Sequence, residues 1–327
     1  MSSATGVREG IYRSSLARRI SRWLEALPHP LLACEITTDY VAAARWTRGG
    51  ASLDGFAIEP LPAGSIVPSP VETNVANASA VRAAVGQVFG RLRARGQDLA
   101  LLVPDPVVRV FVVHFDEFPR APGEAVPLLR WKLKKSVPFE AEETLVSYMR
   151  QAPRDEGVDV VTGLARLRII REYEMLAEAA GMAPGIVMSS TLAALPLIDD
   201  RQATLLARVS GTALTTAIVR EGLLLGYRCT DLPADASRLT PQALLDEVYP
   251  VTAFYQDSWS EGIKAVRLAG LGDRIDEFRR PLEAELRCPV GALLSAAAIG
   301  GRISDDARPL ADRQLDALVG WMLNRGA

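Results

Sequence analysis

The residues best suited to metal binding or nucleophilic catalysis are few in this 327-residue chain and stand far apart. The three cysteines, Cys34, Cys229 and Cys288, form no CxxC pair and have no partnering histidines. Zinc sites and disulfide frameworks need clustered or paired cysteines. A hydrolase needs a nucleophile beside a base, yet the only histidines are His29, in a proline-rich stretch, and His114, within a strand pattern. The sequence therefore predicts no catalytic residue and no metal site.

Other groups that could do chemistry have more ordinary interpretations. Acidic pairs occur at 142–143, 199–200 and 305–306, in loops or at helix starts, where such side chains commonly cap helices or face water rather than act as acid–base catalysts. Gly270-Leu271-Gly272 resembles part of a dinucleotide-binding fingerprint, but the third glycine is missing. Neither pattern predicts an enzyme.

Charge is nearly balanced, because 37 basic and 39 acidic side chains give a formal net charge of −2. Proteins that bind nucleic acid through phosphate contacts usually carry a basic excess, so we expect no nucleic-acid partner. A local exception is the predicted helix 124–136, which carries Arg130, Lys132, Lys134 and Lys135. This helix face is either solvated or binds a partner, and the sequence leaves both interpretations open.

The first thirty residues form a separate, basic amphipathic segment. Arginines are interleaved with an apolar stripe at helical spacing, which consists of Ile11, Leu16, Ile20, Trp23 and Leu24. Such a helix packs on its own protein, or binds an anionic membrane surface or a partner. The segment lacks the uninterrupted apolar core and cleavage site of a signal peptide, and no run reaches the roughly 18–20 apolar residues of a membrane span. We therefore expect a cytoplasmic protein.

Two halves of the chain begin in the same way. Three short strand patterns cover 31–37, 40–47 and 56–61, and three more cover 204–209, 213–220 and 223–229. Alternating helix and strand patterns follow each group, and a length of 327 residues suits two lobes of roughly 150 residues each. A doubled α/β architecture of this kind usually holds its ligand in the cleft between the lobes.

Specific residues in the first half resemble a known family. They are Phe118-Pro119, Leu129-Arg130-Trp131, Ser136-Val137-Pro138-Phe139, Glu142-Glu143 and Tyr148, followed by a strand and helix between Val158 and Pro184. Their order and spacing over about 31–325 resemble the PilM family, actin-like proteins of type IV pilus assembly related to the cell-division protein FtsA. The cytoplasmic domain of GspL, from type II secretion, has a similar fold.

The resemblance implies an α/β, actin-like (ribonuclease H-like) fold of two lobes with an α/β subdomain inserted in the first lobe. The limits expected from the sequence are 1–30 for the basic amphipathic segment, 31–77 and 153–200 for the first lobe, 78–152 for the inserted subdomain and 201–327 for the second lobe.

The resemblance also implies a partner. Members of the PilM family bind the cytoplasmic tail of PilN, a bitopic inner-membrane protein, so we expect a scaffold at the periphery of the inner membrane. The best match lies around Trp131, Pro138 and Phe139, which become the candidate partner-binding residues. Contact with the membrane would be indirect or through residues 1–30, and the chain could form a homo-oligomer. An active actin-like ATPase and a polymerising, FtsA-like filament protein remain as alternatives.

The nucleotide motifs that the resemblance would imply are altered. Actin-like ATPases hold magnesium and phosphates with two D-x-G turns, and adenosine with a later glycine-rich turn. Here Glu35 and Thr37 replace the aspartate and glycine of the first turn, and no carboxylate occurs between Asp200 and Glu221. The expected vestigial site consists of Glu35, Thr37, Thr38, Gly211, Gly270 and Gly272. We expect no ATP turnover and no cofactor, with binding of ATP and magnesium the less favoured alternative.

Overall fold

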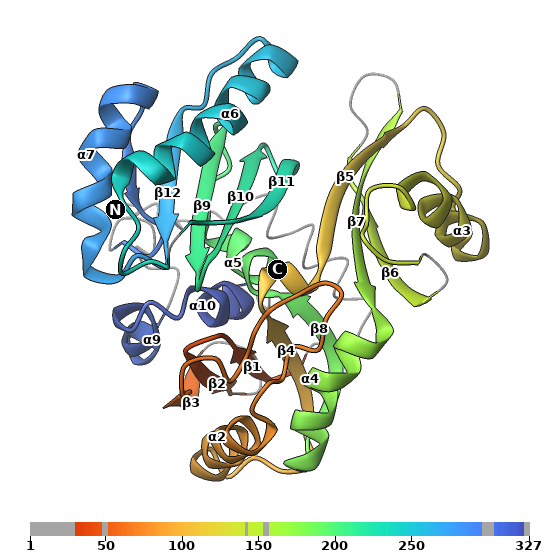
Figure 1. Cartoon of the computed structure of the whole chain (residues 1–327), viewed down its shortest axis with the longest axis vertical. Coiled ribbons are helices and arrows are strands. Elements are labelled where there is room, and N and C mark those ends of the chain that lie inside the picture. Colours follow the sequence, from red (N-terminus) through yellow and green to blue (C-terminus); the bar gives the residue numbers. More distant parts are fainter. Residues whose placement is uncertain are drawn as a thin grey trace, which may run out of the picture.

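Two mixed β-sheets of five strands form the centres of two lobes in the computed structural model (Figure 1). The structure describes residues 30–47, 52–140, 143–152, 157–233, 235–295 and 304–323. The basic amphipathic segment predicted for residues 1–30 lies, apart from Pro30, outside the described residues. None of the helices within these ranges is long and apolar enough to cross a bilayer.

The first sheet has the strand order β3-β2-β1-β4-β8. Its strands are β1 (Leu32–Ile36), β2 (Tyr40–Trp46), β3 (Leu53–Pro60), β4 (Asp98–Val103) and β8 (Ala183–Ser189). The first three form an antiparallel meander, whereas β4 runs parallel to β1 and β8 parallel to β4. Buried side chains on both faces of β1 and β4 explain their continuous apolar runs, as is usual for parallel strands covered on both sides.

The second sheet repeats this arrangement in the order β11-β10-β9-β12-β13. Its strands are β9 (Thr204–Ser210), β10 (Ala213–Arg220), β11 (Leu223–Asp231), β12 (Ala265–Ala269) and β13 (Val290–Ala292). Again a meander is followed by two parallel strands. The repeated mixed sheet confirms the predicted actin-like, two-lobed fold.

Helices cover each sheet. In the first lobe these are α2 (Ala78–Arg91) and α4 (Leu167–Ala179), and in the second α6 (Pro241–Trp259) and α7 (Ile275–Leu286). Helix α2 begins where the Asn77 side chain accepts a hydrogen bond from the Ala80 amide, and α6 where Thr240 caps Ala243 in the same way. The shorter helical elements are η1 (Asp105–Val107), α5 (Ser190–Ala194), η3 (Leu195–Leu197), η4 (Gly272–Arg274), η5 (Asp305–Ala307), α9 (Arg308–Asp312) and α10 (Asp316–Leu323).

The inserted unit is a three-stranded antiparallel sheet of order β5-β7-β6, with one helix on its outer face (Figure 1). It consists of β5 (Arg109–Phe115), α3 (Pro122–Leu133), β6 (Thr144–Arg150) and β7 (Val158–Arg166). Its limits are therefore close to 109–166, which differs at both ends from the predicted 78–152. The reason is long-range pairing: β4 lies between β1 and β8 in the first sheet, and α2 packs on β2 and β3.

The end of the chain also departs from the predicted division, which gave all of 201–327 to the second lobe. Helix α10 crosses back and packs on α5 and β1 of the first lobe. Its apolar residues, with Trp321 fully buried, join a cluster to which both five-stranded sheets contribute. Gly320 makes this packing possible, because a Cβ there would lie 2.2 Å from the Ala193 carbonyl oxygen.

We expect Gly320→Ala to lower the free energy of unfolding by about 2 kcal/mol, because the added methyl meets the backbone of α5 rather than a movable side chain. Gly86→Ala is the matched control: Gly86 lies within α2 with no atom within 4 Å of a Cβ, so alanine should stabilise by up to about 1 kcal/mol. Urea denaturation of both variants measures the difference. Equal stability of the two would contradict the close packing of α10 on α5.

Candidate functional site

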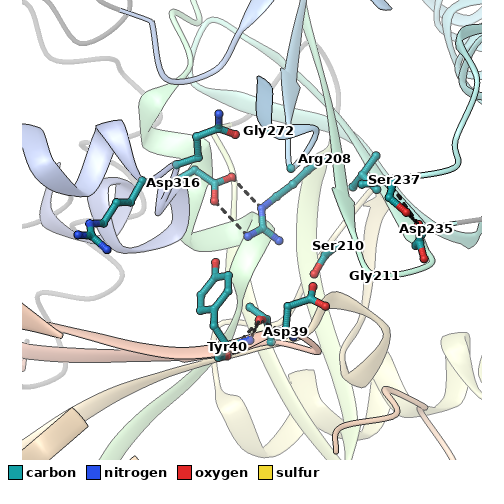
Figure 2. A pocket seen from close by; sticks show the side chains of 15 residues that line it. Asp39, Tyr40, Arg208, Ser210, Gly211, Asp235, Ser237, Gly272 and Asp316 are labelled. Atoms are coloured by element: carbon teal, nitrogen blue, oxygen red, sulfur yellow. Dashed lines mark hydrogen bonds and ion pairs between the residues drawn. The ribbon is translucent and has the colours of Figure 1, made fainter. Parts of the chain in front are cut away.

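The turns that begin the two meanders meet at the cleft between the lobes (Figure 2). A cavity of about 420 Å³ opens there. Among its lining residues are Thr37 and Asp39 from the β1–β2 turn, Gly211 from the β9–β10 turn, and Gly270 and Gly272 after β12. The fold thus brings the predicted cleft residues together, with Thr38 beside the cavity and Glu35 fully buried behind it.

The two meander turns approach each other closely. Gly211 has a φ of +57°, and a Cβ at this position would lie 3.0 Å from the Thr38 hydroxyl oxygen across the cleft. Thr37, in the place of a glycine, uses its hydroxyl within its own turn, because Oγ1 accepts hydrogen bonds from the amides of Asp39 (3.2 Å) and Tyr40 (3.0 Å). The turn amides are therefore partly occupied by the protein itself.

Arg208 on β9 and Asp316 also line the cavity, and Arg208 contacts three buried carboxylates. Its Nε and Nη2 donate to the two carboxylate oxygens of Asp316 at 2.8 and 3.1 Å, a bidentate pair, and Nη2 also donates to Glu35 Oε1 at 3.0 Å. Nη1 lies 3.6 Å from Asp105 Oδ2. Each of the four residues is no more than 4% exposed. We call this set, Glu35, Asp105, Arg208 and Asp316, the Arg208 cluster.

Asp105 extends the cluster to both lobes. From the first lobe, the amide and hydroxyl of Thr191 donate to its carboxylate at 2.9 and 2.6 Å. From the second lobe, the hydroxyls of Thr215 (3.0 Å) and Tyr227 (3.1 Å) donate to the same group. The carboxylate therefore links α5 with β10 and β11.

Burial governs the protonation of this cluster. It raises the pKa of Glu35, and the nearby Arg208 guanidinium opposes that rise. For Arg208, burial alone would lower the pKa, but Asp316 and Glu35 raise the pKa well above its usual value. The guanidinium therefore stays charged. Tyr40 completes the surroundings of Glu35, donating its hydroxyl to Oε2 at 3.1 Å, and burial raises the pKa of that phenol.

These contacts decide how well a magnesium–nucleotide would fit. Magnesium needs carboxylates free to hold it or its water shell, whereas Glu35 and Asp316 already accept hydrogen bonds from Arg208. Within the described ranges, no three His, Cys, Asp or Glu side chains are grouped so as to hold a metal ion. Packing alone explains why position 270 is a glycine, since a Cβ there would lie 1.8 Å from the Val209 carbonyl oxygen. The buried carboxylates Glu35 and Asp316 are thus occupied by a guanidinium rather than free for a hydrated magnesium ion.

Two members of the Arg208 cluster were missed by the sequence analysis, which looked for an acid only near the second turn. Asp105 and Asp316 lie more than 100 residues from Arg208 in the chain. A signal was nevertheless present: Asp105 stands between two prolines directly after a buried strand, and Asp316 begins the apolar run Ala317–Leu323. Acids in such surroundings are rarely buried without a partner.

The candidate partner-binding residues lie elsewhere, on the inserted unit. Trp131 is 67% exposed on α3. Pro138 is exposed and Phe139 half-buried in the connection from α3 to β6, where Phe139 packs against the core of the unit. His114, expected to be an ordinary strand residue, lies in β5 with Nδ1 2.9 Å from Asp159 of the neighbouring β7.

Comparisons with known proteins identify the fold. No protein-family model matches the chain, and neither does any curated protein. A solved structure of a PilM–PilN type IV pilus biogenesis complex matches 92% of this chain and 100% of that chain, at 16% identity and a TM-score of 0.71. A Bacteroides thetaiotaomicron protein with an actin-like ATPase fold and unknown function covers 88% of this chain and 97% of its own, at 14% identity and a TM-score of 0.48.

The cytoplasmic domain of EpsL, an inner-membrane component of the type II secretion system of Vibrio cholerae, matches 72% of this chain and 80% of that domain, at 13% identity and a TM-score of 0.46. The match to the PilM–PilN complex covers nearly the whole chain, and the assignment of the fold rests on this match. At the level of the fold, the predicted resemblance to PilM is confirmed.

We expect Arg208→Met to lower the free energy of unfolding at pH 7 by about 3–5 kcal/mol, because three buried carboxylates lose their cation. Glu35, whose pKa is already raised by burial, would then have a still higher pKa in the folded state than in the unfolded chain. Such a group favours folding at low pH and loses that contribution as the pH rises through its folded pKa. The unfolding free energy lost through Arg208→Met should therefore be smaller at pH 5 than at pH 7.

Arg308→Met is the control, since its ion pair with Asp305 is exposed and should change stability by less than about 1 kcal/mol. Adding Glu35→Gln and Asp316→Asn to Arg208→Met should restore part of the lost stability. Denaturation curves at the two pH values test these statements. An Arg208→Met variant as stable as Arg308→Met would show that the cluster contributes little.

Proposed function

We propose that this protein is a cytoplasmic scaffold of a type IV pilus or type II secretion-like machine, held at the inner membrane by binding the cytoplasmic tail of a PilN-like bitopic protein. The supporting observation is the match, at a TM-score of 0.71 over 92% of the chain, to the structure of a PilM–PilN complex. The scaffold works by binding its partner, and its interlobe cleft has a structural role.

The binding site in this proposal is the free edge of the inserted sheet. In the order β5-β7-β6, strand β6 pairs on one side only, so its other side presents backbone amides and carbonyls. The opposite edge strand, β5, packs near β11 of the second lobe. An extended tail can add to β6 as a further strand, with backbone hydrogen bonds giving affinity and alternate side chains giving specificity.

This edge begins where the inserted unit meets the first lobe. Arg166, at the end of β7, donates to the Val71 carbonyl oxygen of the first lobe at 3.0 Å and to Glu143, just before β6, at 2.8 Å. Arg130 on α3 donates to the Thr144 carbonyl oxygen at 2.8 Å, which fixes α3 to the start of β6. The junction thus combines a strand edge, charged groups and part of α3.

Exposed apolar side chains beside the edge supply the expected anchors. Leu145 on β6 is 43% exposed and Trp131 on the adjoining α3 is 67% exposed. Pro138 and Phe139 precede β6 in the same connection. A buried aromatic or aliphatic anchor commonly contributes most of the affinity for a short peptide.

We expect no ATP turnover. Magnesium-dependent phosphate release should not exceed that of a Glu35→Gln variant, which retains the shape of the side chain, and millimolar Mg–ATP should stabilise the fold by less than about 0.5 kcal/mol. Phosphate-release assays and thermal melts measure both. Saturable stabilisation by Mg–ATP, or release well above the Glu35→Gln level, would favour the alternative of an active actin-like ATPase.

Tail binding is tested by calorimetry with a synthetic peptide of the cytoplasmic tail of a small bitopic protein encoded beside this chain. Leu145→Glu and Trp131→Glu should each weaken binding at least tenfold, which is about 1.4 kcal/mol. Met175→Glu is the matched control, because Met175 is 53% exposed on α4, outside the proposed site. Deletion of 78–152 would remove β4 from the first sheet, so point substitutions give the cleaner test.

Equal binding by all four proteins would contradict the β6 edge as the site. A wild-type chain that binds no such tail would contradict the scaffold function itself.

A further inference from the structure

An apolar groove lies on the second lobe between α6 and the β10–β11 pair. It has a volume of about 280 Å³ and is lined by Ile218, Leu225, Val251, Phe254 and Trp259, among others. Phe254 is 66% exposed, so the groove presents an aromatic side chain to any occupant. Gly226 on β11 keeps the floor open, since the nearest atom to a Cβ there would be the Ile218 methyl at 3.9 Å.

The helix on one side of this groove, α6, is acidic. Helix α6 carries Asp246, Glu247 and Asp257, and no lysine or arginine occurs between residues 241 and 263. Arg228 lines the groove but lies 3.5 Å from Glu247, which balances its charge. An apolar strip bordered by acids on one helix matches a partner with apolar side chains and a basic face.

The chain itself contains such a segment. Residues 8–25 include five arginines and two glutamates. The apolar stripe described above continues through Leu16, Ile20, Trp23 and Leu24, which follow a helical spacing of i, i+4, i+7 and i+8. The segment therefore combines apolar side chains with basic ones, as the groove requires of its occupant.

We propose that residues 11–24 bind as an amphipathic helix in the α6–β11 groove, with the apolar stripe against Val251 and Phe254 and the arginines facing the acids of α6. Because the segment belongs to the same chain, its docking is an intramolecular step, provided that residues 25–29 span the distance from Pro30 to the groove. The same stripe suits an anionic membrane surface. Docking in the groove and contact with lipid would thus exclude each other.

Hydrogen exchange on the full-length chain, without lipid, tests the proposal. In the wild type, the amides of residues 11–24 should exchange at least tenfold more slowly than in a Phe254→Arg variant. Tyr249→Arg is the matched control, because Tyr249 is 56% exposed on the same helix but does not line the groove, so protection should persist. Ile20→Glu changes the apolar stripe of the segment itself, and it should remove the protection as Phe254→Arg does.

Oxidative cross-linking locates the contact independently. A chain with Ile20→Cys and Phe254→Cys should form a disulfide readily, whereas Ile20→Cys with Tyr249→Cys should not. Unprotected exchange of residues 11–24 in the wild type would overturn the proposal and favour a membrane or a separate partner as the target of the segment. Protection that survives both Phe254→Arg and Ile20→Glu would overturn it as well.

Discussion

The guanidinium of Arg208 is the charge on which the centre of this molecule depends. A buried ion is costly unless it is paired and hydrogen-bonded, and here the partners come from β1, η1 and α10 while the cation comes from β9. Because these elements belong to both lobes and to the end of the chain, the Arg208 cluster is satisfied only when all of them are assembled. The cluster therefore couples the folding of the lobes and specifies how they meet.

Further hydrogen bonds join the first lobe and the inserted unit to the second lobe. Asp105 joins α5 to β10 and β11, and Gln151, after β6, exchanges two 2.8 Å hydrogen bonds with the backbone of Leu224 on β11. Here the cation between the lobes is a protein side chain, and the two proposed binding surfaces lie on the inserted unit and on α6. This division agrees with the proposed role as a scaffold.

Much of the fold could be predicted from the sequence, because it follows from local patterns. The two meanders and the helices α2, α4, α6 and α7 all depend on hydrophobic period and on turn residues. The limits of the inserted unit differ from the prediction, since only pairing across 67 residues (Leu32 with Leu99) and 85 residues (Asp98 with Ala183) shows that β4 belongs between β1 and β8. The cleft residues expected from the family resemblance do lie together, whereas Asp105 and Asp316 reach Arg208 only through tertiary structure. The exposure of Trp131 could not be predicted either, because it depends on which face of α3 packs on the sheet of the inserted unit.

The distance between the lobes tests the central claim most directly. Spin labels at Arg82→Cys on α2 and Gln256→Cys on α6 would be exposed, one in each lobe. Cys34 and Cys288 are buried, and burial raises the pKa of the half-buried Cys229 to about 12, so the three native thiols should label poorly. Pulsed electron paramagnetic resonance then reports the interlobe distance with and without Mg–ATP. A rigid junction predicts one narrow distribution that nucleotide leaves unchanged. A second population, or a shift larger than the width of the distribution when Mg–ATP is added, would contradict the claim that Arg208 locks the lobes.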